Sequence, residues 1–149
     1  MSLPRYNYVA EACTKILRGK NVAYTLDGIA TTEDEWKSGY AEQIGTTGDN
    51  ISIMSTVPTE WQVTWAQIEV EVEKLKVEIP LQEVRIERNH LLTDTDWVVA
   101  RASETGTSIP DDWKTYRQAL RDLPANSPSA SINTTTGRLE NVTWPTRPS

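Results

Sequence analysis

The sequence predicts an α+β protein with a small N-terminal unit of helices and strands and a mainly helical C-terminal half. That half should hold a kinked long helix, a helical hairpin and an extended C-terminal tail. Strand-like segments lie before residue 60, apolar residues recur at helical spacing over residues 65–91, and a Ser/Thr/Asn/Pro-rich stretch follows residue 124. The expected domains are residues 1–60, 61–124 and 125–149.

Four elements are expected in the N-terminal unit, in the order helix, strand, helix and strand. Their predicted ranges are residues 7–18, 22–26, 32–44 and 51–54. The first rests on apolar residues at helical spacing, and both strands rest on short β-rich or alternating runs. Thr32 and Glu35 form a capping-box pattern, which predicts the start of the second helix.

A long helix is predicted for the middle of the chain, where Thr64 and Gln67 form another capping-box pattern. One apolar series has the three–four spacing of a coiled-coil seam: Trp65, Ile68, Val72, Leu75 and Ile79. A second series repeats every seven residues: Val63, Val70, Val77, Val84 and Leu91. The two series lie on different sides of a helix, so we expect burial between two partners.

A strand is the alternative for part of this segment. Ile68–Glu73 alternates apolar and acidic residues with the period of a half-buried strand. The capping pattern, the seam and the length of the segment favour the helix. Pro80 has no amide hydrogen and disfavours helical geometry at Ile79, so we expect a kink or break there and a further helix over residues 81–93.

Composition and charge argue against several classes of protein. The net charge is -6, the pI is about 4.8, and no Lys/Arg cluster exceeds a pair, so we expect no nucleic-acid partner. No apolar run approaches the roughly 20 residues of a membrane helix, and the start does not resemble a signal peptide. Cys13 is the one cysteine, which excludes an internal disulfide and a multi-thiolate metal site. We therefore expect a soluble protein of the bacterial cytoplasm, with no membrane partner.

The sequence offers little to a catalytic or metal site. His90 is the one histidine, and no G-x-S-x-G motif accompanies it. The pairs Asp94 with Asp96 and Asp111 with Asp112 fit helix ends better than a cation site. A hydrolase of cell-wall or capsule sugars would need two carboxyl groups facing each other in a cleft. We expect no enzyme, no cofactor and no metal.

Two blocks in the C-terminal half are distinctive. Arg88–Trp97 reads RNHLLTDTDW, Trp113–Pro124 reads WKTYRQALRDLP, and Val142–Pro145 near the end reads VTWP. They resemble the C-terminal module of the phage tail assembly chaperone family, in which R-x-x-L-L-x-x-T-D-W precedes W-x-x-Y-R-Q-x-L-R-D-L-P and a W-P segment often follows. The resemblance covers about residues 84–145, and residues 101–106 depart from the family's acidic spacer.

The resemblance implies a tail fibre assembly chaperone and no reaction. Such a protein would bind a tail fibre or tail-tip protein in the host cytoplasm and assist its folding, trimerisation or attachment, as a homo-oligomer or in a hetero-complex. Retention in the virion tail stays open. The alternative is a structural tail or fibre component with no chaperone role.

The motif also predicts particular contacts. Trp97 should cap the helical pair and meet a face formed by Trp113, Tyr116 and Leu120. Arg117 and Arg121 lie four residues apart and can bind carboxylates such as Asp94, Asp96 or those of a partner. The expected partner contacts are Trp65, Val70, Val77, Val84, Leu91, Trp97, Trp113, Tyr116, Arg117, Arg121 and Trp144. For Trp97, Trp113 and Leu120 the favoured role is to hold the hairpin together, whereas for Arg117, Arg121 and Trp144 both roles remain open.

Overall fold

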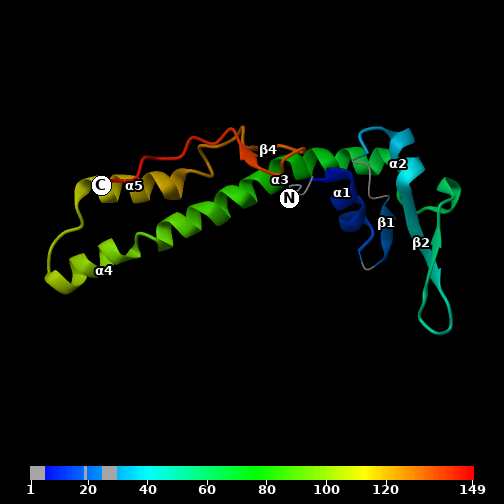
Figure 1. Ribbon diagram of the computed structural model, residues 1–149, viewed down its shortest axis with the longest axis horizontal. Helices are drawn as coiled ribbons and strands as arrows, with labels where there is room; N and C mark the ends of the chain where they lie inside the picture. Colours follow the sequence, from blue (N-terminus) through cyan, green and yellow to red (C-terminus); the bar gives the residue numbers. More distant parts are fainter. Residues whose placement is uncertain (1–5, 19, 25–29) are drawn as a thin grey trace. The chain divides into compact units, whose positions relative to one another are not determined.

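The computed structural model of the chain confirms the α+β class, with long helices and small antiparallel sheets (Figure 1). It describes residues 6–18, 20–24 and 30–149. The described chain divides into two compact units. The first is the chain up to Lys76 with Thr134–Gly137, and the second is Val77–Asn133 with Arg138–Ser149.

The first unit combines two short helices with a three-stranded antiparallel sheet. Its elements are α1 (Tyr8–Ile16), β1 (Val22–Tyr24), α2 (Glu33–Gly39), β2 (Tyr40–Thr46), β3 (Ser52–Ser55), the 3-10 helix η1 (Pro58–Glu60) and the start of α3 (Trp65–Thr93). The strand order is β1-β2-β3, and a bulge lies between Gln43 and Gly45 of β2. The expected end of the first strand at Leu26 lies outside the described residues.

The helix predicted over residues 32–44 is wrong in its second half. Its capping box forms as expected, with Glu35 N donating to Thr32 Oγ1 at 3.3 Å and Thr32 N donating to Glu35 Oε2 at 3.2 Å. The hydrogen bonds that Thr31 N and Thr31 Oγ1 donate to the Glu35 carboxylate, together with that from Thr32 N, hold the pKa of Glu35 below its ordinary value. The helix ends at Gly39, and the next seven residues form β2. A strand lets Tyr40 and Glu42 both face the core, which a helix does not.

The core of the first unit is built around large aromatic rings. The Trp36 ring centroid lies 5.1 Å from Tyr40, 5.0 Å from Trp61 and 5.8 Å from Trp65. Because the chain has no Phe, indoles and phenols fill the space that phenylalanine often occupies, and their polar atoms need partners. Trp61 Nε1 meets this need by donating to Ser55 O at 2.9 Å.

Residues 68–79 are helical, so the strand alternative is wrong. The capping box at the start of α3 forms, with Thr64 N donating to Gln67 Oε1 at 3.0 Å and Gln67 N donating to Thr64 Oγ1 at 3.4 Å. The helix continues through Pro80 to Thr93, so the separate helix predicted after a break is the second part of α3. A proline removes one hydrogen bond from a helix, and the side chain of Pro80 is fully buried, which offsets part of that loss. The long helical run from Trp65 to Thr105 is kinked at the turn of Asp94 and Thr95, which separates α3 from the next helix. The sequence placed the kink at Pro80, where α3 is continuous.

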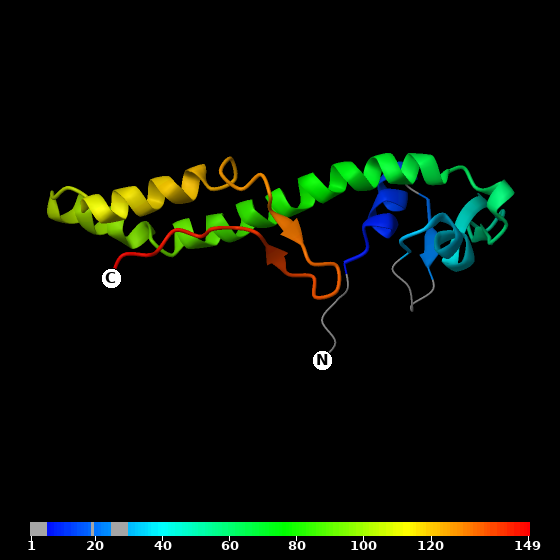
Figure 2. The same ribbon diagram turned by 90° about the horizontal axis from the view of Figure 1, so that it is seen from above.

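The second unit is a helical hairpin with a short β-hairpin and an extended tail. After α4 (Asp96–Thr105) the chain reverses, and α5 (Asp111–Asp122) runs back toward α3 (Figure 2). Pro110 occupies the N-cap of α5, with Asp111 and Asp112 in the first turn. β4 (Ser131–Ile132) pairs with β5 (Leu139–Glu140) inside the region predicted to be extended, and the remaining residues form the tail.

None of the helices in the described residues has the length and apolar character needed to cross a membrane.

Candidate functional site

The two distinctive sequence blocks meet at Arg117, which lies on α5 and is only 8% exposed. Its Nη1 donates to Leu92 O at 2.8 Å and to Thr95 Oγ1 at 2.5 Å, and its Nη2 donates to Asp96 Oδ1 at 2.8 Å. The expected pairing of Arg117 with a carboxylate is therefore confirmed, with Asp96 as the partner. One guanidinium thus binds both sides of the turn between α3 and α4.

Thr95 belongs to the first sequence block, but the sequence predicted no contact for its side chain. Its side chain is 1% exposed, and its hydroxyl lies 2.9 Å from Leu92 O and 3.1 Å from Leu91 O. These carbonyls belong to the last turn of α3, where no further helical amide follows to bond them. The sequence feature that could have indicated Thr95 is a hydroxyl residue directly before Asp96, at the start of a helix.

An apolar cluster lies beneath the turn and joins the two helices of the hairpin. Its buried members are Val98, Trp113, Tyr116 and Leu120, and Leu91, Leu92 and Ile109 pack against them. The Trp97 ring meets Trp113 edge-on, with the centroids 5.6 Å apart. The predicted contact of Trp97 with the α5 face is therefore confirmed. Unlike Trp113, which is 7% exposed, Trp97 is 48% exposed.

A hollow of about 150 Å³ opens beside the exposed Trp97 indole, at the end of the helical hairpin. Its lining residues are Trp97, Val98, Arg101, Ala102, Thr107, Ser108, Pro110 and Trp113. Arg101 brings a positive charge to its rim. At the start of α5, Lys114 Nζ binds Asp111 Oδ1 at 2.9 Å, and this hydrogen bond lowers the pKa of Asp111 below its ordinary value. The hollow thus has both apolar and polar walls, and Arg101 is the charged residue among those that line it. We call Trp97, Arg101, Pro110 and Trp113 the hairpin tip.

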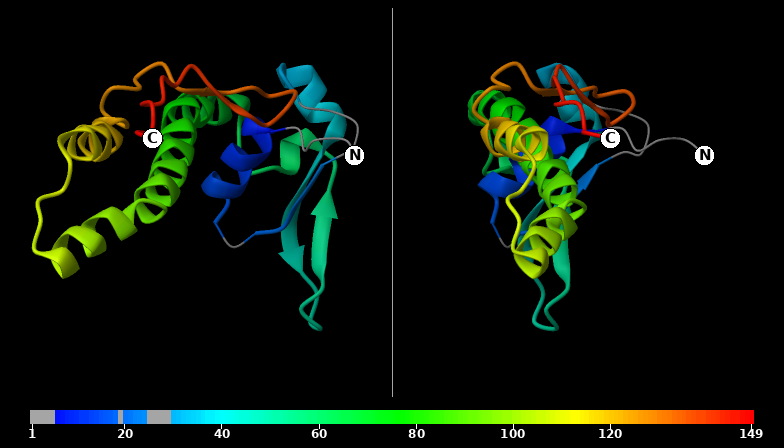
Figure 3. Two further views of the ribbon diagram at one scale, coloured as in Figure 1. Left: turned by 60° about the vertical axis from the view of Figure 1, so that its left-hand side comes forward. Right: turned by 90° about the vertical axis from the view of Figure 1, so that its left-hand side faces the viewer.

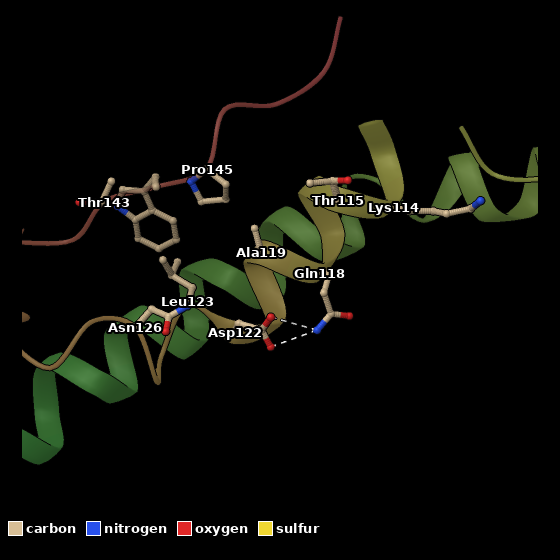
Figure 4. Close-up of a pocket in the computed structure, with 10 residues that line it drawn as sticks. Lys114, Thr115, Gln118, Ala119, Asp122, Leu123, Asn126, Thr143 and Pro145 are labelled. Atoms are coloured by element: carbon tan, nitrogen blue, oxygen red, sulfur yellow. Dashed lines mark hydrogen bonds between the residues drawn. The ribbon is translucent and has the colours of Figure 1, made fainter. Parts of the chain in front are cut away.

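The C-terminal tail docks on its own chain. Val84, Leu123 and Ala130 form a second buried cluster, and Leu139, Val142 and Trp144 pack against it. Figure 4 shows Thr143 and Pro145 of the tail facing Leu123 and Asn126 at the end of α5. Farther along, Arg147 Cζ lies 5.7 Å from the Trp113 ring centroid, a cation–π contact. Trp144 therefore packs on a surface of the same chain.

Replacing Trp144 with Ala should release the tail. The half-buried indole is the largest apolar group of the tail, and its loss removes about 1–2 kcal/mol of local burial. We expect trypsin to cleave after Arg138 roughly tenfold faster, since cleavage follows the population of the open form. Thr146→Ala, in the same tail and exposed, is the control. Equal cleavage rates for both variants would show that Trp144 does not hold the tail.

The remaining predicted partner contacts differ in exposure. Val84 is fully buried and Leu91 is half-buried within the second unit, whereas Val70 and Val77 are 59% and 60% exposed. Trp65 is half-buried against Trp36 in the first unit, while the side chain of Arg121 is exposed. Of the predicted contacts, those exposed on the chain are Val70, Val77, Trp97 and Arg121. In the described ranges, no three His, Cys, Asp or Glu side chains are placed to hold a metal ion.

Comparison with known families bears on the second half of the chain. Residues 81–149 match a family model described as phage tail assembly chaperone protein. The matched range includes both sequence blocks, the hairpin tip and the docked tail, and leaves residues 1–80 outside it. Neither the curated proteins nor the solved structures contain a match to the chain. The family match supports a general role as a chaperone of phage tail assembly.

Proposed function

Because residues 81–149 match the model of the phage tail assembly chaperone family, we propose that the protein binds a tail fibre or tail-tip protein in the host cytoplasm. There it assists the folding, trimerisation or attachment of that protein. The observation that carries the proposal is the 48% exposed indole of Trp97 at the hairpin tip, beside a hollow of about 150 Å³. Exposed indoles next to a hollow are typical of surfaces that bind another protein.

The turn before Trp97 supports this assignment, because it fixes the indole before a partner arrives. Arg117 binds both Thr95 and Asp96, the two residues directly before Trp97. The edge-on contact with Trp113 restrains the ring as well. A side chain that is already ordered loses little conformational entropy on binding, so more of the contact energy appears as affinity.

A fibre subunit is a fitting partner on physical grounds. Trimeric fibres depend on β contacts between residues distant in sequence, so they fold slowly and expose apolar surface meanwhile. A binding protein that covers such surface during folding would suppress aggregation. The net charge of -6 keeps the chain itself soluble while it does so.

The first test is binding of Trp97→Ala to the tail fibre protein of the same phage, measured by co-purification and by titration calorimetry. We expect the dissociation constant to rise about 10- to 100-fold, the range of a central aromatic contact. Val99→Ala, also on α4 and 39% exposed, is the matched control and should change affinity little. If Trp97→Ala binds with unchanged affinity and has an unaltered circular dichroism spectrum, the hairpin tip does not contact the fibre protein.

The exposed valines of α3 are a second proposed contact, tested separately. Val70→Asp together with Val77→Asp places charges on two side chains that are 59% and 60% exposed, so the fold should tolerate both. If these side chains meet the fibre protein, co-purification should be lost. If co-purification persists, the seven-residue series has no role in binding.

A further inference from the structure

The β2–β3 hairpin of the first unit leaves one strand edge open. In the order β1-β2-β3, β3 pairs with β2 alone, and no other strand of the described chain lies on its far side. Figure 3 shows the hairpin reaching away from α1, with β3 on the outside. The open edge belongs to residues outside the family match.

This edge lacks the usual protection against pairing. Exposed edge strands generally carry charges, proline or a covering segment, because their unpaired main-chain groups attract other strands. No residue from 51 to 57 is charged or proline, and four apolar side chains of this run are exposed. They are Ile51 at 64%, Ile53 at 44%, Met54 at 38% and Val57 at 47%. A neutral, apolar and open edge is a surface for strand pairing.

We propose that two copies of the chain pair through this edge, antiparallel and about a two-fold axis at Ile53, so that two three-stranded sheets become one continuous sheet. Two-fold pairing is the commonest closed arrangement of identical chains. In this register Ile53 faces Ile53 of the second copy, and Ser52 faces Met54 of the second copy. The proposal requires no tail protein and stands apart from the function proposed above.

The main-chain geometry of the hairpin supports this register. At its turn, Thr47 N donates to Ile51 O at 2.9 Å, so the groups of Ile51 face β2. Since the direction alternates along an antiparallel strand, the main-chain groups of Ser52 and Met54 face the open side. Pairing Ser52 with Met54 of the second copy therefore closes two sets of free donors and acceptors. Ile53 then occupies a close pair with its own copy.

The charges permit the same arrangement. Each copy has a net charge of -6, so most surfaces of two copies repel each other. Along the strand edge, however, a run without charged residues extends from residue 50 to residue 59. In the proposed register Asp49 at the hairpin turn lies opposite Val57 of the second copy, rather than opposite another acid. The edge is thus a surface on which two acidic chains can meet without facing carboxylates.

Light scattering coupled to size exclusion tests the proposal on the full chain. The native protein should have twice the monomer mass of 16.8 kDa. Ile53→Lys places two ammonium groups face to face at the axis, so we expect the dimer dissociation constant to rise at least about 100-fold. Thr46→Lys, exposed on β2 and identical in charge change, should remain dimeric. A native protein that is monomeric at every concentration, or an Ile53→Lys variant that stays dimeric, would overturn the proposal.

Two further variants separate strand pairing from general surface contact. Met54→Pro removes an amide that faces away from β2, so its own sheet should survive, as circular dichroism can verify, while the dimer is lost. Ile53→Cys should form an intermolecular disulfide, because close pairs bring the two Cα atoms to about 4.5 Å. The native Cys13 is fully buried, and Thr46→Cys serves as the control. If Met54→Pro is folded and dimeric, or if a disulfide forms in Thr46→Cys but not in Ile53→Cys, the β3 edge is not the dimer interface.

Discussion

Replacing Arg117 with Met should lower the free energy of unfolding of the second unit by about 3 kcal/mol, because it removes the donor of three hydrogen bonds at a largely buried position. Thr95 Oγ1 loses a charged partner at a buried position, and Leu92 O loses one at a partly buried position. The ion pair with Asp96 adds little to this figure, since the Asp96 side chain is 63% exposed and solvent screens it. The main loss is that of the buried polar bonds.

Arg121→Met is the matched control for this prediction. It lies one turn later on α5, changes the charge equally and has an exposed side chain, so its effect should stay within roughly 0.5 kcal/mol. Urea unfolding of two compact units need not be two-state, so amide hydrogen exchange in α4 and α5 is the better measure. Equal protection in both variants would show that Arg117 does not hold the turn.

The same variant links the turn to the proposed function. Trp97 directly follows Asp96, so a loosened turn leaves the indole less ordered before binding. Arg117→Met should therefore weaken binding of the tail fibre protein, whereas Arg121→Met should do so only if Arg121 itself touches the partner. Comparing the two variants separates a positioning role from a contact.

The sequence correctly predicted the elements that are determined by residues close together in the chain. The capping boxes at Thr32 and Thr64 mark the true starts of α2 and α3, because each needs only residues three positions apart. The seam spacing likewise identified α3 against the strand alternative. Pro80 misled the prediction of a break, since the remaining helical bonds of a 29-residue helix outweigh the one that proline removes.

Features that depend on contacts between residues distant in the sequence could not be predicted from it. The seven-residue series predicted one apolar face, but Val84 is buried by Leu123 and Ala130, while Val77, one repeat earlier, is 60% exposed. Periodicity shows which side chains share a face and not which of them the rest of the chain covers. For the same reason the sequence suggested that Arg117 binds an acid, but not that the bond fixes the turn before Trp97.

The failure at β2 has a related cause, and it centres on Glu42. Nothing local suggests that a glutamate is fully buried, yet its exposed fraction is 0%. Its carboxyl oxygens accept hydrogen bonds from Tyr40 Oη at 3.2 Å, Gln62 N at 2.8 Å and Val63 N at 3.3 Å. Two of these donors lie 20 and 21 residues away, so the side chain organises a contact between β2 and the segment before α3.

Replacing Glu42 with Ala should therefore lower the free energy of unfolding of the first unit by about 3–5 kcal/mol. The change removes an acceptor from the buried amide of Val63, the partly buried amide of Gln62 and the phenol of Tyr40, and it adds a cavity. The lost hydrogen bonds and the cavity each cost on the order of 1–3 kcal/mol. Amide hydrogen exchange in β1, β2 and β3 measures this loss within the first unit.

Glu42→Gln distinguishes the hydrogen bonds from the volume of the side chain. The variant keeps the shape of the side chain and one acceptor oxygen, but it turns an amide nitrogen toward a donor. Its free energy of unfolding should therefore lie between those of the native chain and Glu42→Ala. Glu60→Ala removes a carboxyl group from a residue that is mostly exposed, and should cost much less. If Glu42→Ala were as stable as Glu60→Ala, Gln62 and Val63 would be held near β2 by packing of Trp61 alone, and the buried carboxyl group would have no part in specifying the strand.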